Sequence, residues 1–208
     1  MIYNPGQFEN IVPYIKTTPE WLILGGPGDG NEAQCAAKMY PGIQIIGLEP
    51  LEQMREHQLS NGWPVEAKLL PYALSDTHGM VEMCINPDNF RASSTIPNWC
   101  AAAPATDRAK ALIVETVTID SLNDPNDPFR KVILWLDIEG SEITAIRGAT
   151  QLFDSGEVIL VNVEITDRYP EHAAKVNSLL THYGFREVRR WNVQPGLVHD
   201  RIYTRSRK

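Results

Sequence analysis

The stretch WLILGGPGDGNEA, Trp21 to Ala33, decides the fold of this 208-residue chain. Four apolar residues lead directly into a segment that holds four glycines within six positions. Glycine costs backbone entropy on folding, so this density is favoured only where the backbone turns tightly or is closely approached by another group. A short apolar run between proline and glycine is typical of a fully buried strand. We therefore predict a strand over residues 21–24, a glycine turn, and a helix over residues 31–39.

The same alternation extends outward along the chain. The segment IQIIGL, residues 43–48, predicts a second buried strand that stops at Glu49-Pro50, since proline disfavours helical geometry in the residue before it. Further strands are predicted at residues 67–70, 81–85, 114–117, 131–136 and 158–163, and helices at residues 11–16, 51–58, 143–153 and 173–183. Continuous apolar strands separated by helices are typical of a parallel sheet covered on both faces.

The C-terminal segment has a different pattern. Gly184 follows the last predicted helix in a C-cap position, and FREVRRWN and DRIYTR then alternate apolar and polar residues, as the strands of an antiparallel hairpin do. We predict a single α/β domain over residues 1–208, with a Rossmann-like, seven-stranded, mostly parallel sheet, an antiparallel C-terminal strand and helices on both faces. Residues 1–20 form the lead-in, and the long connection over residues 86–110 is predicted to be a substrate lid.

Composition narrows the class of protein. The formal net charge is −7, with 43% hydrophobic and 22% charged residues, which is ordinary for a folded domain and unfavourable for binding a nucleic-acid backbone. No apolar run approaches the ~18 residues of a membrane span. The three cysteines are widely spaced and form no CxxC pair, so we expect reduced thiols and no zinc site. These features favour a cytoplasmic enzyme or binding domain that binds neither nucleic acid nor a membrane.

Two features predict a nucleoside-bearing cofactor. Gly26, Gly28 and Gly30 form a GxGxG turn before a helix, and helix N-termini present unpaired N–H groups to a ligand. The dinucleotide fingerprint GxGxxG requires glycine where this chain has Asn31, which argues against a nicotinamide or flavin cofactor. Glu49 ends the second strand, about where an acid accepts hydrogen bonds from ribose hydroxyls. Taken alone, the glycines could form a tight turn that binds no ligand. Taken alone, Glu49 could be a solvated acid at the end of a strand.

Six motifs in order carry a resemblance to a known family. They are GGPGDG at 25–30, GLEP at 47–50, YALSD at 72–76, SST at 93–95, VTIDSL at 117–122 and LDIEGSEITAIRGA at 136–149. Together they resemble the FkbM-type methyltransferases, a branch of the S-adenosylmethionine-dependent class I methyltransferase fold, over about residues 21–164. The later segment LLTHYGFREV at 179–188 is similar to the common tail of class I methyltransferases.

The resemblance implies S-adenosylmethionine as the cofactor. The glycine turn would line its methionine end, Glu49 would hold the ribose, and the segment 72–76 would border the adenine. The implied cofactor-binding residues are Gly26, Pro27, Gly28, Asp29, Gly30, Glu49, Tyr72, Ala73 and Asp76. One position departs from the family pattern: Leu24 stands where the family usually carries an acid that helps to hold the cofactor's ammonium group. The alternative to an enzyme is therefore a non-catalytic, methyltransferase-like binding protein with a degenerate cofactor site.

Carboxylates at the strand ends supply the candidate catalytic groups. Asp137 and Glu139 are two residues apart, so they point the same way if the strand continues that far. Either could remove the proton of an acceptor hydroxyl as a general base, which predicts O-methylation of a small molecule or glycan. Alternatively, both residues and Glu164 bind a divalent cation, or the acids are structural. Glu142 begins the next helix, where an acid is stabilised by the positive N-terminus.

Overall fold

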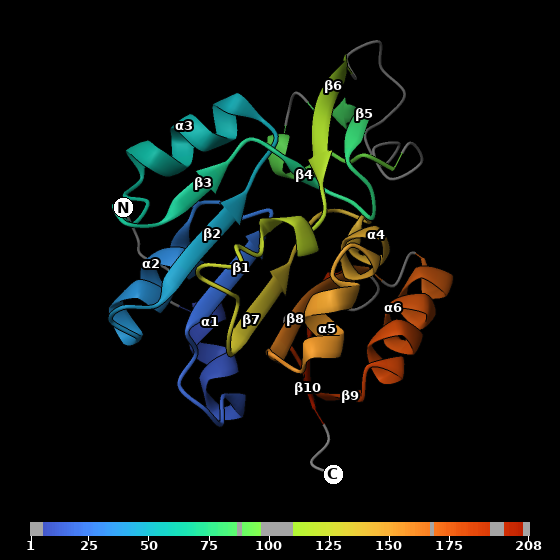
Figure 1. Cartoon of the computed structure of the whole chain (residues 1–208). Coiled ribbons are helices and arrows are strands. Elements are labelled where there is room, and N and C mark those ends of the chain that lie inside the picture. The colour runs from blue at the N-terminus through green and yellow to red at the C-terminus, as the bar shows by residue number, and fades with distance from the viewer. Residues whose placement is uncertain (1–5, 87–88, 97–109, 167–168, 192–197, 206–208) are drawn as a thin grey trace.

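The computed structural model describes residues 6–86, 89–96, 110–166, 169–191 and 198–205, and its centre is a seven-stranded sheet (Figure 1). The strand order is β3-β2-β1-β7-β8-β10-β9. The strands are β1 (Trp21–Gly25), β2 (Gln44–Leu48), β3 (Lys68–Leu70), β7 (Val132–Leu136), β8 (Val158–Thr166), β9 (Phe185–Trp191) and β10 (Val198–Arg205). The first five in this order pair in parallel, and β10 runs antiparallel to both β8 and β9. The predicted seven-stranded, mostly parallel sheet is confirmed.

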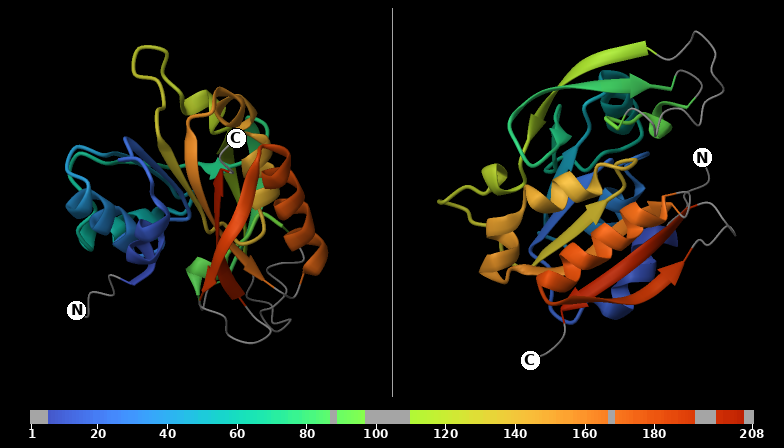
Figure 2. Two further views of the ribbon diagram at one scale, coloured as in Figure 1. Left: turned by 90° about the horizontal axis from the view of Figure 1, so that it is seen from below. Right: turned by 90° about the vertical axis from the view of Figure 1, so that its right-hand side faces the viewer.

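Helices cover both faces of this sheet, as predicted. They are α1 (Gly6–Ile11), α2 (Asn31–Met39), α3 (Glu52–Ser60), α4 (Glu142–Arg147), α5 (Thr150–Ser155) and α6 (Pro170–His182), with short 3-10 turns η1 (Val12–Tyr14), η2 (Phe90–Ala92) and η4 (Asp120–Leu122). Helices α1 and α2 lie on one side of the sheet, and α4, α5 and α6 lie on the other (Figure 2).

Alternation along the central strands explains the two layers. In β1, Trp21 and Ile23 pack into the cluster that contains α4, α5 and α6, whereas Leu22 and Leu24 pack into the cluster that contains α1 and α2. The same division runs along β7, all five residues of which are buried. Because both faces of the strand are covered, the strand reads as a continuous apolar run, which is the pattern that predicted it.

Two helix predictions are wrong in their bounds. The helix predicted over 11–16 lies earlier in the chain, as α1 and η1. The single helix predicted over 143–153 is divided into α4 and α5 at Gly148, where a Cβ atom would lie 2.1 Å from the backbone oxygen of Ser75. This close approach of a distant backbone segment is a tertiary constraint, and local propensity does not contain it.

A second, smaller sheet lies beyond the carboxyl ends of the parallel strands (Figure 1). It has the order β4-β6-β5, with β4 (Ala73–Leu74), β5 (Gly79–Ile85) and β6 (Lys110–Val117). The strands predicted at 81–85 and 114–117 therefore exist but do not join the main sheet. Their inward side chains, including Met83 and Val114, pack with Leu51 and Met54 near the start of α3. The small sheet thus stands above the edge where ligands bind in open α/β folds.

The cysteines only partly match the expectation of reduced thiols. Cys35 is a buried thiol outside any disulfide, whereas Cys84 is disulfide-bonded, so the expectation is wrong for Cys84. Cys100 lies outside the described residues. In the part of the chain that the structure describes, none of the helices combines the length and the apolar character that crossing a membrane requires.

Candidate active site

A cavity of about 440 Å³ opens at the carboxyl ends of β1, β2, β7 and β8. It is lined by many of the residues singled out from the sequence: Leu24, Gly26, Pro27, Gly28, Asp29, Glu49, Ala73, Asp137, Glu139 and Glu164. Gly30, Tyr72 and Asp76 are not among its lining residues: Gly30 caps α2, Tyr72 packs against the hydrophobic core, and Asp76 accepts a hydrogen bond from Ser75. The glycine turn and the strand-end acids therefore share one cavity.

The glycine turn is built from three residues in left-handed conformations. The φ angles are +68° at Gly26, +52° at Gly28 and +80° at Gly30, a region that glycine occupies at little cost. A Cβ atom at Gly26 would lie 1.8 Å from the backbone oxygen of Asp137, so the backbones pack too closely for a side chain. A Cβ atom at Gly28 would meet nothing within 4 Å. Gly28 thus leaves room beside the turn, as a ligand that approaches the backbone requires.

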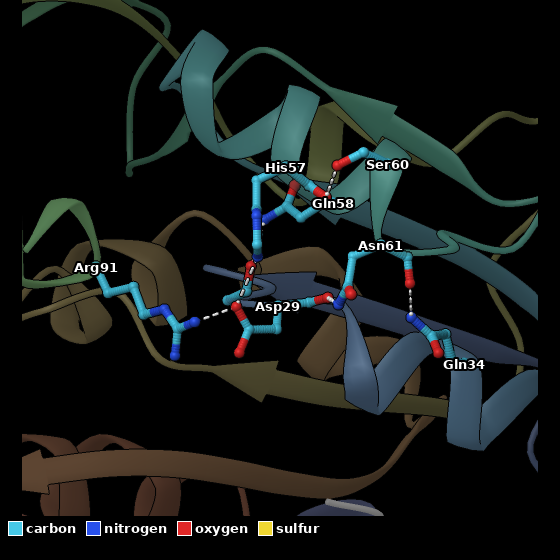
Figure 3. A network of polar contacts seen from close by, with 8 residues as sticks. Asp29, Gln34, His57, Gln58, Ser60, Asn61 and Arg91 are labelled. Carbon is cyan, nitrogen blue, oxygen red and sulfur yellow. Dashed lines mark hydrogen bonds and ion pairs between the residues drawn. The ribbon is translucent and has the colours of Figure 1, made fainter. Parts of the chain in front are cut away.

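Side chains from α3 and the residue after it fix the backbone of this turn (Figure 3). The side-chain amide of Gln58 donates to the backbone oxygen of Gly28 at 3.0 Å, and that of Asn61 donates to the backbone oxygen of Asp29 at 2.8 Å. Gln34 in turn donates to the backbone oxygen of Asn61 at 2.9 Å. The turn is therefore preorganised by its neighbours.

The side chain of Asp29 joins the turn to two further elements. Its Oδ1 atom lies 2.9 Å from Nε2 of His57 on α3 and also contacts Nη2 of Arg91 on η2 (Figure 3). Arg91 itself lines the cavity. This contact brings the segment after β5 over the glycine turn. No sequence pattern predicts it, because a single arginine in a long connection has no periodic context.

Glu49 projects into the cavity from the end of β2. It is 8% exposed, and its Oε1 atom accepts a hydrogen bond from the backbone N–H of Leu51 at 2.9 Å. Arg55 donates to the backbone oxygens of Glu49 and Pro50, which fixes the strand end. Burial raises the pKa of Glu49 to about 7, since the charged form loses hydration that a single hydrogen bond does not replace. The described residues provide no other hydrogen bond to this carboxylate, which leaves its acceptor capacity for a ligand.

Across the cavity, three acids from two neighbouring strand ends converge. One carboxylate oxygen from each of Asp137, Glu139 and Glu164 lies within 4.8 Å of the others. Burial, together with the neighbouring acids, raises the pKa of Asp137 well above its ordinary value, and burial raises that of Glu164 to about 8. A hydrogen bond joins the Asp137 and Glu164 side chains, so this pair keeps a proton near neutral pH.

Glu142 supports the turn that carries Glu139. Glu139 has a φ of +50°, which is strained for a residue with a side chain. The Oε1 atom of Glu142 accepts from the backbone N–H groups of Ile138 at 3.2 Å and Gly140 at 3.1 Å, and its Oε2 atom lies 3.0 Å from Nε2 of His172 on α6. Glu142 is only 2% exposed. Its role is therefore more specific than that of the helix-start acid expected from the sequence.

The first part of the predicted lid lies against this turn. Ser94 donates to the backbone oxygen of Glu139 at 2.6 Å, and the hydroxyls of Thr95 and Ser141 are 2.6 Å apart. Ser93 and Thr95 line the cavity. Residues 97–109, the larger part of the predicted lid, lie outside the described residues.

Comparisons with known proteins give a family match and similar folds. A family model described as the methyltransferase FkbM domain matches residues 25–187. Comparison with curated proteins gives no match. Among solved structures, the precorrin-6y C5,15-methyltransferase of Geobacter metallireducens GS-15 is similar with a TM-score of 0.52 and 12% identity, covering 96% of this chain and 86% of that one.

Two more solved structures have similar scores. Magnesium protoporphyrin IX methyltransferase from Synechocystis PCC 6803, with bound S-adenosylhomocysteine, has a TM-score of 0.51 at 11% identity, covering 96% of this chain and 80% of that one. A putative tRNA (m1A22) methyltransferase of Streptococcus pneumoniae, in complex with S-adenosylmethionine, has a TM-score of 0.50 at 8% identity, covering 97% and 73%. At these identities the likeness establishes a shared fold.

Proposed function

The chain belongs to the methyltransferase FkbM domain family, and we propose that it transfers a methyl group from S-adenosylmethionine to a hydroxyl oxygen of a small molecule or glycan. One observation carries the proposal: a single cavity has the glycine turn and Glu49 on its cofactor side and the three strand-end acids beyond them. When bound, S-adenosylmethionine supplies an electrophilic methyl group on its sulfonium sulfur. The remaining steps belong to side chains of this chain.

The cavity residues fit the cofactor's adenosine. Glu49 has unused acceptor capacity at a strand end, and its carboxylate would accept hydrogen bonds from the two ribose hydroxyls. Gly28 leaves open space beside a turn whose backbone is held in place from α3. Ala73, Leu48 and Leu74 supply apolar lining for the adenine ring.

The strand-end acids are the proposed base. A hydroxyl must lose its proton as its oxygen attacks the methyl group, and a base works best with a pKa near the working pH. Asp137 and Glu164 have raised pKa values and hold a proton between them, so the pair accepts the hydroxyl proton once the held proton has passed to solvent. We assign the proton-accepting role to Asp137 or Glu139, with Glu164 as the partner of Asp137.

A divalent cation is a second way for the same acids to act. The three carboxylate oxygens lie within 4.8 Å of one another, and carboxylate oxygens are the ligands that magnesium and calcium prefer. A cation there would bind the acceptor hydroxyl and lower its pKa. Calorimetric titration of the protein with magnesium or manganese, before and after substitution of Glu164 by glutamine, distinguishes this role from that of a metal-free base.

The charge of the site supports an acceptor other than nucleic acid. The described cavity lining contains six carboxylates, and the whole chain has a net charge of −7. A polyphosphate backbone would be repelled from such a surface. A neutral hydroxyl compound meets no such barrier.

We propose a cytoplasmic location for this chemistry.

The alternative is a binding protein that does not catalyse transfer, and Leu24 is the observation that favours it. Leu24 lines the cavity with a fully buried apolar side chain at the position where the family usually has an acid. If Leu24→Asp tightens cofactor binding by about tenfold, or ~1.4 kcal/mol, the native site is weakened or uses another contact.

Calorimetry tests the proposal, and a transfer assay then tests the acceptor class. We expect S-adenosylmethionine and S-adenosylhomocysteine to bind, and methyl-labelled cofactor to label hydroxyl compounds in preference to matched amines. If calorimetry shows no heat of binding at millimolar cofactor, the proposal is wrong. Binding without transfer to any hydroxyl compound would favour the non-catalytic alternative.

A further inference from the structure

The small sheet has a strand that is paired on one side only along most of its length. Strand β6 pairs with β5 from Lys110 to Thr116, and with β4 at Thr116 and Val117 alone. In the right-hand view of Figure 2, β6 (yellow-green) lies at the rim of the molecule with β5 (green) beneath it. Unpaired backbone N–H and C=O groups along such an edge are a template for a further strand.

The hydrogen bonds of β5 show which residues of β6 point outward. Cys84 exchanges two backbone hydrogen bonds with Ser94, at 2.8 and 3.0 Å, so its N–H and C=O groups point away from β6. Ala111 lies opposite Cys84 and therefore points its own backbone groups away from β5. Because this direction alternates along a strand, the backbone groups of Ile113 and Glu115 also point outward.

The β4 side of the strand confirms this alternation. The backbone oxygen of Val117, two residues beyond Glu115, accepts a hydrogen bond from the N–H of Ser75 at 3.0 Å on that side. In the part of the chain that the structure describes, the outward backbone groups of Ala111, Ile113 and Glu115 have no such partner. The open edge of β6, as we use the term, is residues 111–115.

Apolar side chains are exposed on both faces of this open edge. Ile113 is 57% exposed and Leu112 is 45% exposed, and neighbouring residues of a strand point to opposite faces. A strand added at this edge would therefore cover apolar surface on each face as well as pairing the backbone. Both contributions favour an added strand.

The two edges of the main sheet lack this combination. At one end, β3 has only three residues and begins with the exposed Lys68. At the other end, β9 exposes Arg186, Arg189 and Arg190. Short length and charged side chains are the usual ways in which natural sheets prevent pairing at an edge. Residues 111–114, in contrast, have the uncharged sequence ALIV.

We propose that the open edge of β6 binds a second copy of this chain as an antiparallel strand, with a two-fold axis at Ile113. Ile113 then lies opposite Ile113 of the partner subunit, and Ala111 lies opposite Glu115 of the partner subunit. Only an axis at Ile113 pairs the outward groups of all three residues among themselves. This inference does not depend on the proposed methyl transfer.

Self-complementarity is the reason for assigning a second copy to this edge. The outward residues of one strand meet the outward residues of the other, and the apolar Ile113 side chains meet at the axis. The arrangement is also electrostatically compatible, because the acid at Glu115 faces an alanine of the other copy and no like charges are opposed. Pairing of residues 111–115 is much smaller than a standard interface of about 20–30 residues a side, so the dimer is expected to be weak.

Sedimentation equilibrium of the full chain measures this association. We expect the wild-type protein to dimerise with a Kd on the order of 100 µM. A wild-type protein that stays monomeric at about 1 mM, ten times that Kd, would leave the edge to a strand of another protein and overturn the proposal.

Two lysine substitutions on one face of β6 provide a matched test of the register. Ile113→Lys places two cations opposite each other at the axis, and we expect the Kd to rise by about tenfold or more. Ala111→Lys places each new cation opposite Glu115 of the partner subunit, and we expect the Kd to fall by about fivefold for the two symmetric pairs. Both variants change the net charge equally, so a general charge effect would move both Kd values in the same direction. That result would overturn the proposed register.

Two proline substitutions distinguish the edges of the small sheet. Ile113→Pro removes an N–H donor from the open edge, whereas Met80→Pro removes one from the outer edge of β5, because Met80 points the same way as Cys84. Neither change removes a hydrogen bond between β5 and β6. We expect Ile113→Pro to abolish the dimer and Met80→Pro to retain it; the reverse would place the interface on β5 and overturn the proposal. Circular dichroism verifies the fold of each variant, and the lysine pair decides the question if a proline variant does not fold.

Discussion

At the scale of single residues, the buried carboxylate of Glu49 lowers the stability of the folded protein above neutral pH. The pKa of an unburied glutamate is 4.5, and burial raises that of Glu49 to about 7. Between these values the folded protein binds more protons than the unfolded chain, so the contribution of Glu49 to stability falls as pH rises through this window. Above about pH 7 the full cost is present. This cost is consistent with the ribose-binding role that we propose for Glu49.

Substitution of Glu49 by glutamine should therefore stabilise the protein and weaken cofactor binding. Since each pKa unit corresponds to about 1.4 kcal/mol, we expect a gain in the free energy of unfolding on the order of 3 kcal/mol at pH 8 and less than about 1 kcal/mol at pH 5. Urea denaturation at the two pH values measures it. A variant less stable than wild type at pH 8 would show that the buried charge is well compensated.

Cofactor affinity should depend on the ionisation of the same side chain. Ribose hydroxyls donate to the ionised carboxylate, which is about one tenth populated at pH 6 and predominant at pH 8 when the pKa is about 7. We expect the Kd of S-adenosylhomocysteine to fall about tenfold between pH 6 and pH 8 in wild type and to change little in Glu49→Gln. Equal pH profiles for the two proteins would argue against a ribose contact.

Two glycines of one turn should respond differently to alanine. Gly26→Ala places a methyl group against the Asp137 backbone oxygen, so we expect it to cost more than about 3 kcal/mol or to prevent folding. Gly28→Ala meets no atom within 4 Å and should cost only the strain of its positive φ, about 1–2 kcal/mol, while its methyl group weakens S-adenosylhomocysteine binding. Urea denaturation and calorimetry measure the two effects. Equal stability of the two variants would contradict this account of the turn.

The sequence could not predict every residue of the site. Gly26, Gly28 and Glu49 stand at fixed places relative to apolar strands, so their positions follow from the pattern. Arg91 lies in a long connection, and Glu32, which also lines the cavity, resembles any acid in the first turn of a helix. Their location at the cavity depends on how the small sheet and α2 pack, which periodicity does not encode.

At the scale of elements, α4 and α6 hold the turn that carries Glu139 through one buried pair. Glu142 on α4 contacts His172 on α6 and accepts from two backbone N–H groups beside Glu139. Glu142→Ala would leave these groups without their acceptor, so we expect a loss of about 3 kcal/mol in the free energy of unfolding. Glu142→Gln keeps a neutral acceptor and should lose less. Urea denaturation, with the exposed Glu52→Ala as control, measures the difference; equal losses in the Glu142→Ala and Glu52→Ala variants would contradict it.

Elements were predictable where local pattern and tertiary environment agree. The buried strands β1, β2, β7 and β8 read as apolar runs because both of their faces are covered. Side chains alternate along a strand in the same way in both sheets. The sequence therefore could not predict that β5 and β6 belong to a separate sheet. The break between α4 and α5 comes from the contact of Gly148 with the Ser75 backbone.

At the scale of the whole molecule, the main sheet, the small sheet and the glycine turn all meet at one cavity. A ligand that fills this cavity contacts all three parts, so it should raise the free energy of unfolding of the whole protein. With S-adenosylhomocysteine at 100 times its Kd, we expect about 2.7 kcal/mol of added stability, or a rise in Tm of about 5–10 °C for a chain of this size. Thermal unfolding followed by fluorescence measures it. Adenine alone should give a smaller shift, and an equal shift with adenine would contradict a site that holds the whole cofactor.

The most direct measurement for the central claim is a crystal structure of the protein with S-adenosylhomocysteine. The account predicts the adenosyl group in the cavity, with both ribose hydroxyls on the carboxylate of Glu49 and the sulfur atom directed toward Asp137 and Glu139. A ligand bound elsewhere, or a cavity closed by side chains in the presence of saturating ligand, would contradict it.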